Sequence, residues 1–138
     1  MKTDSVLLDL QRATHATLQL LSAELVDLDL TPSEINALGN LADTTPRTVS
    51  ELGTAAGSRP TTLTGVLDRL ERRGLITRGA RAGDRRAVLI ELTADGQRTA
   101  AIVRSTLESI ERRALSGIDP AAVAGFRTVL AALTSAGS

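Results

Sequence analysis

The segment from Thr48 to Thr93 constrains the fold of this chain most, because it carries two helix signals separated by a glycine. Thr48 to Glu51 reads Thr-Val-Ser-Glu, which is a capping box and predicts a helix start. Gly57 follows this short helix and is the residue type that most easily adopts the positive φ of a helix end. Pro60 then fits the first turn of a second, longer helix, which Gly74 ends. Two helices joined by a short glycine-containing turn predict a helix-turn-helix.

A basic β-hairpin is expected directly after the second helix. Leu75 to Gly79 and Ala87 to Leu92 are predicted as two strands, and the second is almost continuously apolar. The loop between them, Ala80 to Arg86, is rich in arginine and contains Gly83, which suits a tight turn. A hairpin in this position is a wing, and arginines at its tip can enter the minor groove of DNA where it is narrow.

The charge of the chain is strongly polarised along its length, although the formal net charge is zero. Between Ser58 and Arg86 there are 8 basic and 3 acidic residues, or 8 − 3 = +5, and the rest has 8 − 13 = −5. We interpret the positive segment as a nucleic-acid-binding surface. Its arginines are Arg59, Arg69, Arg72, Arg73, Arg78, Arg81, Arg85 and Arg86. For Arg72 and Arg73, at the helix end, a favourable interaction with the helix dipole is an equal alternative to phosphate contact.

Four further helices are predicted, two before this segment and two after it. A long amphipathic helix covers Ser5 to Asp27, and its apolar stripe needs either the chain's own core or a partner subunit to pack on. Thr31 to Glu34 is another capping box that begins a helix. Thr93 caps the helix that follows the hairpin, and Asp119 begins the last one. At 138 residues, the chain has the length of one domain.

The residue composition argues against an enzyme. The chain has no cysteine and one histidine, which leaves no catalytic triad, no zinc cluster and no thiol switch, and we expect no metal and no cofactor. The single histidine, His15, is better explained as a polar-face or interface residue than as a ligand or pH sensor. No apolar run approaches the roughly 18 residues of a membrane span, and no signal-peptide core is present, so a cytoplasmic protein is expected.

The order of these elements resembles the MarR family of bacterial transcriptional regulators. The segment Asp84 to Gly96 looks like the wing signature of that family, an Asp-x-Arg followed by a strand and Leu-Thr-x-x-Gly. The segment Thr64 to Ile76 is similar to the end of its recognition helix. The expected fold is therefore mainly α with a small β wing (α+β). It would have a winged helix-turn-helix lobe at 31–93 and dimerisation helices at 1–30 and 94–138.

The resemblance implies a homodimer whose two winged lobes bind a pseudo-palindrome in double-stranded DNA. It implies that Asp84 braces the wing by pairing with an arginine and that Arg86 reaches the minor groove. The family often has a basic residue where this chain has Gly65, so the sequence departs from the pattern there. Many family members also bind a small-molecule effector between the dimer helices and the winged lobe, and such an effector, of open identity, is a third expected partner.

The sequence thus predicts a DNA-binding regulator, more a repressor than an activator, with a protein-binding winged helix that does not bind DNA as the alternative. The residues expected to contact DNA are Ser58, Arg59, Thr61, Thr62, Thr64, Arg69, Arg81, Asp84, Arg85 and Arg86. Those expected at the dimer interface are Val6, Leu7, Leu10, Ile118, Phe126, Leu130 and Leu133.

Overall fold

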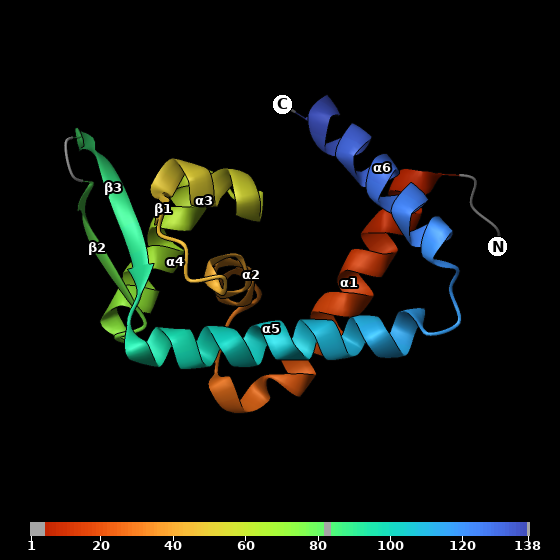
Figure 1. The fold of residues 1–138 in the computed structure, drawn as a ribbon, viewed down its shortest axis with the longest axis horizontal. Helices are drawn as coiled ribbons and strands as arrows, with labels where there is room; N and C mark the ends of the chain where they lie inside the picture. Colours follow the sequence, from red (N-terminus) through yellow and green to blue (C-terminus); the bar gives the residue numbers. More distant parts are fainter. Residues whose placement is uncertain (1–4, 82–83, 138) are drawn as a thin grey trace. The chain divides into compact units, whose positions relative to one another are not determined.

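The computed structural model describes residues 5–81 and 84–137, and it is mainly α-helical with one small antiparallel sheet (Figure 1). This is the fold class that the sequence predicted. The chain divides into two compact units, Met1–Leu107 and Glu108–Ser138. Helix α5 begins in the first unit and ends in the second. The elements are α1 (Val6–Glu24), η1 (Val26–Leu28), α2 (Pro32–Leu41), β1 (Arg47–Thr48), α3 (Val49–Ala56), α4 (Pro60–Arg72), β2 (Ile76–Arg81), β3 (Asp84–Leu92), α5 (Ala94–Leu115) and α6 (Pro120–Ala136).

The first helix ends slightly earlier than expected. The sequence predicted a helix to Asp27, but α1 ends at Glu24 and a 3₁₀ turn follows. Leu25 has φ −106° and ψ 19°, which lies outside the α-helical region, and Asp29 then adopts the left-handed conformation with φ 51°. The chain therefore turns before Thr31, whose hydroxyl accepts a hydrogen bond from the Glu34 amide and begins α2.

Helices α3 and α4 form the predicted helix-turn-helix. The capping box at Thr48 is present, and Gly57 ends α3 with φ 66°, a conformation that strongly favours glycine. Pro60 is in the first turn of α4, as expected. The helices are held together by a core of aliphatic side chains that are at most 2% exposed, among them Leu38, Leu52, Leu63, Leu67 and Leu70. Burial of such side chains is the main stabilising contribution to the lobe.

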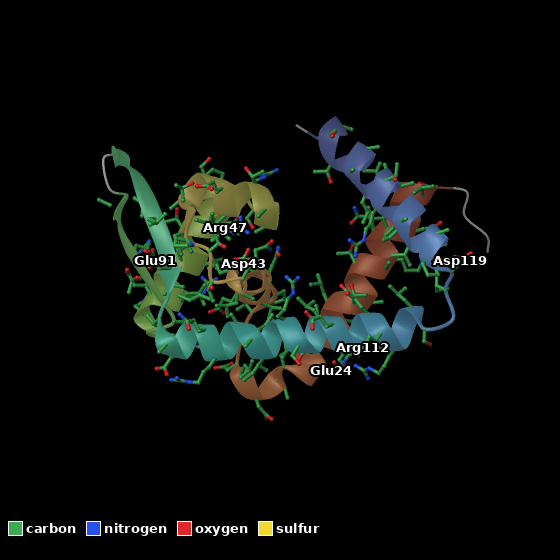
Figure 2. All side chains as sticks on the ribbon, viewed as in Figure 1. Glu24, Asp43, Arg47, Glu91, Arg112 and Asp119 are labelled. Atoms are coloured by element: carbon green, nitrogen blue, oxygen red, sulfur yellow. The ribbon has the colours of Figure 1, made fainter. Side chains whose placement is uncertain are left out.

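The hairpin is longer than predicted and is joined by a third strand. Strands β2 and β3 pair in an antiparallel register that places Ile76 opposite Leu92 and Arg81 opposite Asp84. The two-residue strand β1, which the sequence did not predict, pairs with the other side of β3, so the sheet order is β1-β3-β2. Arg47 supports β1, because its Nε donates to the Asn40 carbonyl at 3.0 Å and its Nη2 lies 3.1 Å from Asp43 Oδ2 (Figure 2).

The end of α4, the start of β2 and the start of α5 meet around Thr93. The Thr93 hydroxyl donates to the Gly74 carbonyl at 2.6 Å and accepts from the Gly96 amide at 3.0 Å. The Thr93 amide donates to the Leu75 carbonyl at 3.0 Å. Gly96 is buried against that same carbonyl: a Cβ added at Gly96 would lie 1.8 Å from the Leu75 oxygen. This junction fixes the recognition helix and the wing to α5.

Helix α6 begins as predicted, because Asp119 accepts a hydrogen bond from the Ala121 amide and Pro120 occupies the first turn. None of the 17 residues of α6 is buried within the described chain. A search of the described residues finds no helix with the length and apolar character of a membrane span.

Candidate functional site

Helix α4 has one buried face and one exposed polar face. Leu63, Val66, Leu67 and Leu70 are buried against the lobe. The exposed face carries four residues that the sequence predicted to contact DNA, Thr61, Thr62, Thr64 and Arg69. The hydroxyl proton of Thr64 is already donated to the Pro60 carbonyl at 2.9 Å, so this side chain has only its acceptor capacity left. The face thus presents the hydroxyl groups of the three threonines together with the guanidinium of Arg69.

Two other predicted residues, Ser58 and Arg59, lie at the start of α4. Ser58 is half-buried in the turn, and its amide donates to the Gly53 carbonyl at 3.0 Å. Arg59 is the N-cap residue, is exposed, and makes no side-chain capping bond. The positive end of a helix next to an exposed guanidinium favours binding of a phosphate group.

Arg73 has a structural role that the sequence did not predict. Its Nη1 and Nη2 donate to the carbonyls of Asp29 and Leu28, each at 2.8 Å. Its Nη1 also lies 3.8 Å from Oε2 of Glu34, which is 3% exposed and therefore needs a cationic neighbour. Neither a phosphate contact nor the helix dipole is needed to explain this arginine, since it joins the end of α4 to the segment before α2.

Arg78 joins the wing to the recognition helix. Its Nη2 lies 2.8 Å from Asp68 Oδ1 and 2.8 Å from Glu71 Oε1, so one guanidinium of β2 bridges two carboxylates of α4. The hydrogen bond from Arg78 holds the pKa of Glu71 below its usual value, and the bonds to Glu71 and then Asp68 raise the pKa of Arg78. The bridge uses two of the three acidic residues of the basic segment, which leaves the positive charge of the other arginines less compensated.

The wing residues are placed by their backbone only. Arg81 ends β2 opposite Asp84, and Arg85 and Arg86 follow in β3. The side chains of these four residues, and the loop residues 82–83, lie outside the described part of the chain. The expected roles of Asp84 and Arg86 therefore stay predictions.

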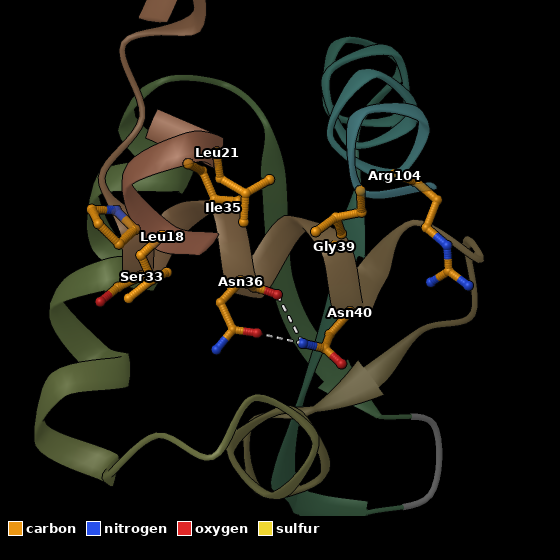
Figure 3. A pocket seen from close by; sticks show the side chains of 10 residues that line it. Leu18, Leu21, Ser33, Ile35, Asn36, Gly39, Asn40 and Arg104 are labelled. Atoms are coloured by element: carbon orange, nitrogen blue, oxygen red, sulfur yellow. Dashed lines mark hydrogen bonds between the residues drawn. The ribbon is translucent and has the colours of Figure 1, made fainter. Parts of the chain in front are cut away.

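A cavity of about 390 Å³ lies among α1, α2 and α5, entirely within the first unit (Figure 3). Its apolar wall is aliphatic, and its polar groups come from α2 and α5. Figure 3 shows Asn36 and Asn40 on α2, with Arg104 projecting from α5. The lining residues are Leu18, Leu21, Pro32, Ser33, Ile35, Asn36, Gly39, Asn40, Arg104 and Leu107. Its volume suits a small organic molecule.

One lining side chain connects this cavity to the helix-turn-helix. The side-chain amide nitrogen of Asn36 (Nδ2) donates to the carbonyl of Ala56, the last residue of α3, at 2.8 Å. The side-chain amide nitrogen of Asn40 (Nδ2) donates to both the side-chain and the backbone oxygen of Asn36, each at 2.8 Å. A change in the position of Asn36 would therefore act on the residue immediately before the Gly57 turn.

Four of the seven predicted interface residues are exposed. Val6 is 58% and Leu7 55% exposed on α1, Phe126 is 52% exposed on α6, and Ile118 before α6 is 48% exposed. Leu10, Leu130 and Leu133 are half-buried. Large apolar side chains exposed in such numbers are characteristic of surfaces that another protein covers. His15 is also exposed on α1, which does not distinguish an interface role from an ordinary polar-face role.

Comparison with known proteins identifies the fold and its relatives. The model of the MarR family matches residues 30–88. A probable transcriptional regulator from Pseudomonas aeruginosa is 30% identical, with 94% of this chain and 97% of that one covered and a TM-score of 0.74. CouR from Rhodococcus jostii RHA1 bound to p-coumaroyl-CoA is 26% identical, with 95% and 92% covered and a TM-score of 0.84.

A third similar structure is that of BpsR from Bordetella bronchiseptica, whose DNA binding is regulated by 6-hydroxynicotinic acid. BpsR is 25% identical to this chain, with 97% of this chain and 96% of that one covered and a TM-score of 0.80. No curated protein matches the chain significantly. The family model covers the whole helix-turn-helix and most of the wing, and the full-length likeness extends it to the flanking helices. The chain therefore belongs to the MarR family of transcriptional regulators, which are not enzymes.

Proposed function

We propose that this regulator is a homodimer that binds a pseudo-palindromic operator and represses transcription. The observation that carries the proposal is the exposed face of α4, where hydroxyl groups and a guanidinium stand opposite a fully buried apolar face. Threonine hydroxyls suit base edges in the major groove, and the threonine methyl can contact the methyl group of thymine. The Arg78 bridge holds the wing to this helix, so both elements approach DNA as one rigid body.

Affinity and sequence preference come from different residues in this proposal. Arg59, with the wing arginines Arg81 and Arg85, provides positive charge along the phosphate backbone. Thr61, Thr62 and Thr64 approach the bases, while Arg86 reaches the minor groove and Asp84 braces the wing. The two recognition helices of the dimer would lie about 34 Å apart, so that they meet successive major grooves on one side of the duplex.

The experiment that tests this function is the selection of bound duplexes from a random pool. We expect an enriched sequence with two-fold symmetry and half-sites about 10 base pairs apart. Enrichment without symmetry would contradict the dimeric arrangement. Absence of any enrichment would contradict DNA recognition and favour the alternative, a winged helix that binds another protein.

The exposed apolar residues of α1 and α6 support the dimer. Replacing Leu130 with aspartate places a charge among the side chains that we propose to be buried between subunits, and burial of an unpaired charge is costly. We expect the variant to be monomeric by analytical ultracentrifugation at micromolar concentration. Thr128→Asp adds the same charge on the opposite side of α6, where Thr128 is exposed, and should stay dimeric. A Leu130→Asp protein that sediments as a folded dimer would remove α6 from the interface.

The cavity beside α2 supports a small-molecule effector that carries an acid group. Among the described residues that line it, Arg104 is the one charged side chain. A guanidinium binds carboxylate and phosphate groups with good geometry. The effector of BpsR, 6-hydroxynicotinic acid, has such a group. The Asn36–Ala56 hydrogen bond provides a direct route from a ligand in this cavity to the turn before α4.

Thermal unfolding can test this chemistry. We expect at least one of 6-hydroxynicotinate, 4-hydroxybenzoate and octanoate to stabilise the protein by about 2.7 kcal/mol at a hundred times its Kd. The uncharged amide of the same compound should have little effect. Arg104→Met should abolish the stabilisation, while Arg98→Met, on the same helix but outside the cavity, should retain it. Equal stabilisation by acid and amide would show that Arg104 does not recognise an anion.

A further inference from the structure

The backbone conformation at residue 65 does not explain why α4 has a glycine in its middle. Gly65 lies inside the helix, and its φ is not positive, so any residue could adopt this conformation. Glycine is disfavoured in helix interiors because it loses most conformational freedom on folding. What distinguishes the position is its neighbour on the next turn: a Cβ added at Gly65 would lie 3.5 Å from Nη1 of Arg69.

The Arg69 side chain therefore extends back along α4 toward its N-terminus, in the direction that helical side chains favour. It brings the guanidinium beside Gly65, on the exposed face that also carries Thr61 and Thr62. Within the described chain, Arg69 makes no hydrogen bond and no ion pair. Its donors are thus available for a ligand, in contrast to those of Arg73 and Arg78.

The position of the cation distinguishes Arg69 from the other exposed arginines of α4. Arg59 is at the N-cap and Arg72 is the last helical residue, so both lie at the ends of the helix. A recognition helix in the major groove contacts base edges with residues of its N-terminal half, whereas the helix N-terminus itself favours a phosphate group. A guanidinium beside Gly65 is at the half of the helix that approaches the bases.

We propose that Arg69 reads a guanine in each half-site, and that Gly65 provides the space in which its guanidinium lies. Arginine donates two hydrogen bonds to O6 and N7 of guanine, and this pair is the commonest specific contact in the major groove. The inference rests on the proposed DNA-binding function. It assigns to Arg69 the readout of a G·C pair, whereas Arg59, Arg81 and Arg85 contribute affinity for any sequence.

The test compares wild-type protein with Arg69→Ala, Arg69→Lys and two Gly65 variants on the selected operator. We expect wild type to prefer G·C over A·T at one symmetric pair of positions by about 5- to 150-fold. Arg69→Ala should lose this preference, and Arg69→Lys should keep only part of it, because lysine lacks the planar fork. An operator with 7-deazaguanine at that position lacks the N7 acceptor, so it should weaken binding of wild type but leave Arg69→Ala unchanged.

The two Gly65 variants test whether the guanidinium of Arg69 needs the space beside residue 65. Gly65→Ala should keep the preference, since 3.5 Å is an ordinary van der Waals distance and the guanidinium is at the end of a flexible side chain. Gly65→Leu fills the space and should lose the preference as Arg69→Ala does, with no further loss in the double variant. An Arg69→Ala protein that selects the same guanine would overturn the inference while leaving DNA binding intact. If wild type selects no sequence, the proposed function and this inference both fail.

Discussion

Replacing Gly96 with alanine is expected to destabilise the protein more than any other single methyl addition that the structure suggests. The new Cβ would lie 1.8 Å from the Leu75 oxygen and 2.8 Å from the Leu75 carbonyl carbon, and both are backbone atoms that cannot rotate away. The start of α5 must then move off the end of α4. This movement also stretches the hydrogen bonds of Thr93 to Gly74 and Leu75.

The expected cost is at least about 3 kcal/mol of unfolding free energy, the upper part of the range for overpacked sites. For a domain of this size the midpoint of thermal unfolding should fall by roughly 10 °C. Differential scanning calorimetry of the purified variant measures both quantities. Expression only as insoluble protein would agree with the prediction, and urea unfolding of refolded material would then provide the value.

Gly65→Ala is the matched control, because it adds the same methyl group to a helical glycine. Its Cβ meets only the flexible end of Arg69 at 3.5 Å, and the residue gains helix propensity. We expect it to raise stability by about 0.4–1 kcal/mol. Equal stability of the two alanine variants would mean that the α5 start does not pack on Leu75 as described.

The parts of the fold that depend on local sequence signals were predictable. Capping boxes at Thr31 and Thr48 satisfy backbone donors within one turn, so the residue types alone indicate the helix starts. Gly57 and Gly74 both adopt positive φ, as expected for residues that end helices. Strand β1 was missed because two residues give no periodic pattern, and its existence depends on pairing with β3, more than 40 residues away.

The candidate site was predictable in composition but not in its division of roles. The sequence placed eight arginines in one segment, and nothing in it distinguished those that hold the fold together from those that face solvent. Arg73 donates to carbonyls 44 and 45 residues earlier, and Arg78 bridges to another element, so both roles require the tertiary structure. The Asn36–Ala56 link joins α2 to α3, and the cavity lies among α1, α2 and α5, so both arise from helix packing that no local pattern encodes.

Operator affinity is expected to fall steeply with salt, and this is the largest effect that we predict on function. The chain as a whole is neutral, so nonspecific attraction between net charges cannot hold it on DNA. Binding must come from local contacts of arginine with phosphate, each of which releases condensed counterions. If each subunit of a dimer makes three to five such contacts, the complex makes about 6–10, and its affinity should drop about 10³- to 10⁵-fold between 50 and 200 mM salt.

The slope of log affinity against log salt separates the two kinds of arginine. Fluorescence anisotropy with a labelled operator, titrated at several salt concentrations, provides this slope. In a dimer, Arg85→Ala leaves up to two phosphates without a cation and should reduce the slope by about 1 for each of them, on specific and unrelated duplexes alike. Arg69→Ala should leave the slope nearly unchanged while it removes the guanine preference, because an arginine bound to a base displaces no phosphate counterion. A wild-type slope near zero would contradict phosphate-dominated binding, since neutral hydrogen bonds to bases alone have little dependence on ionic strength.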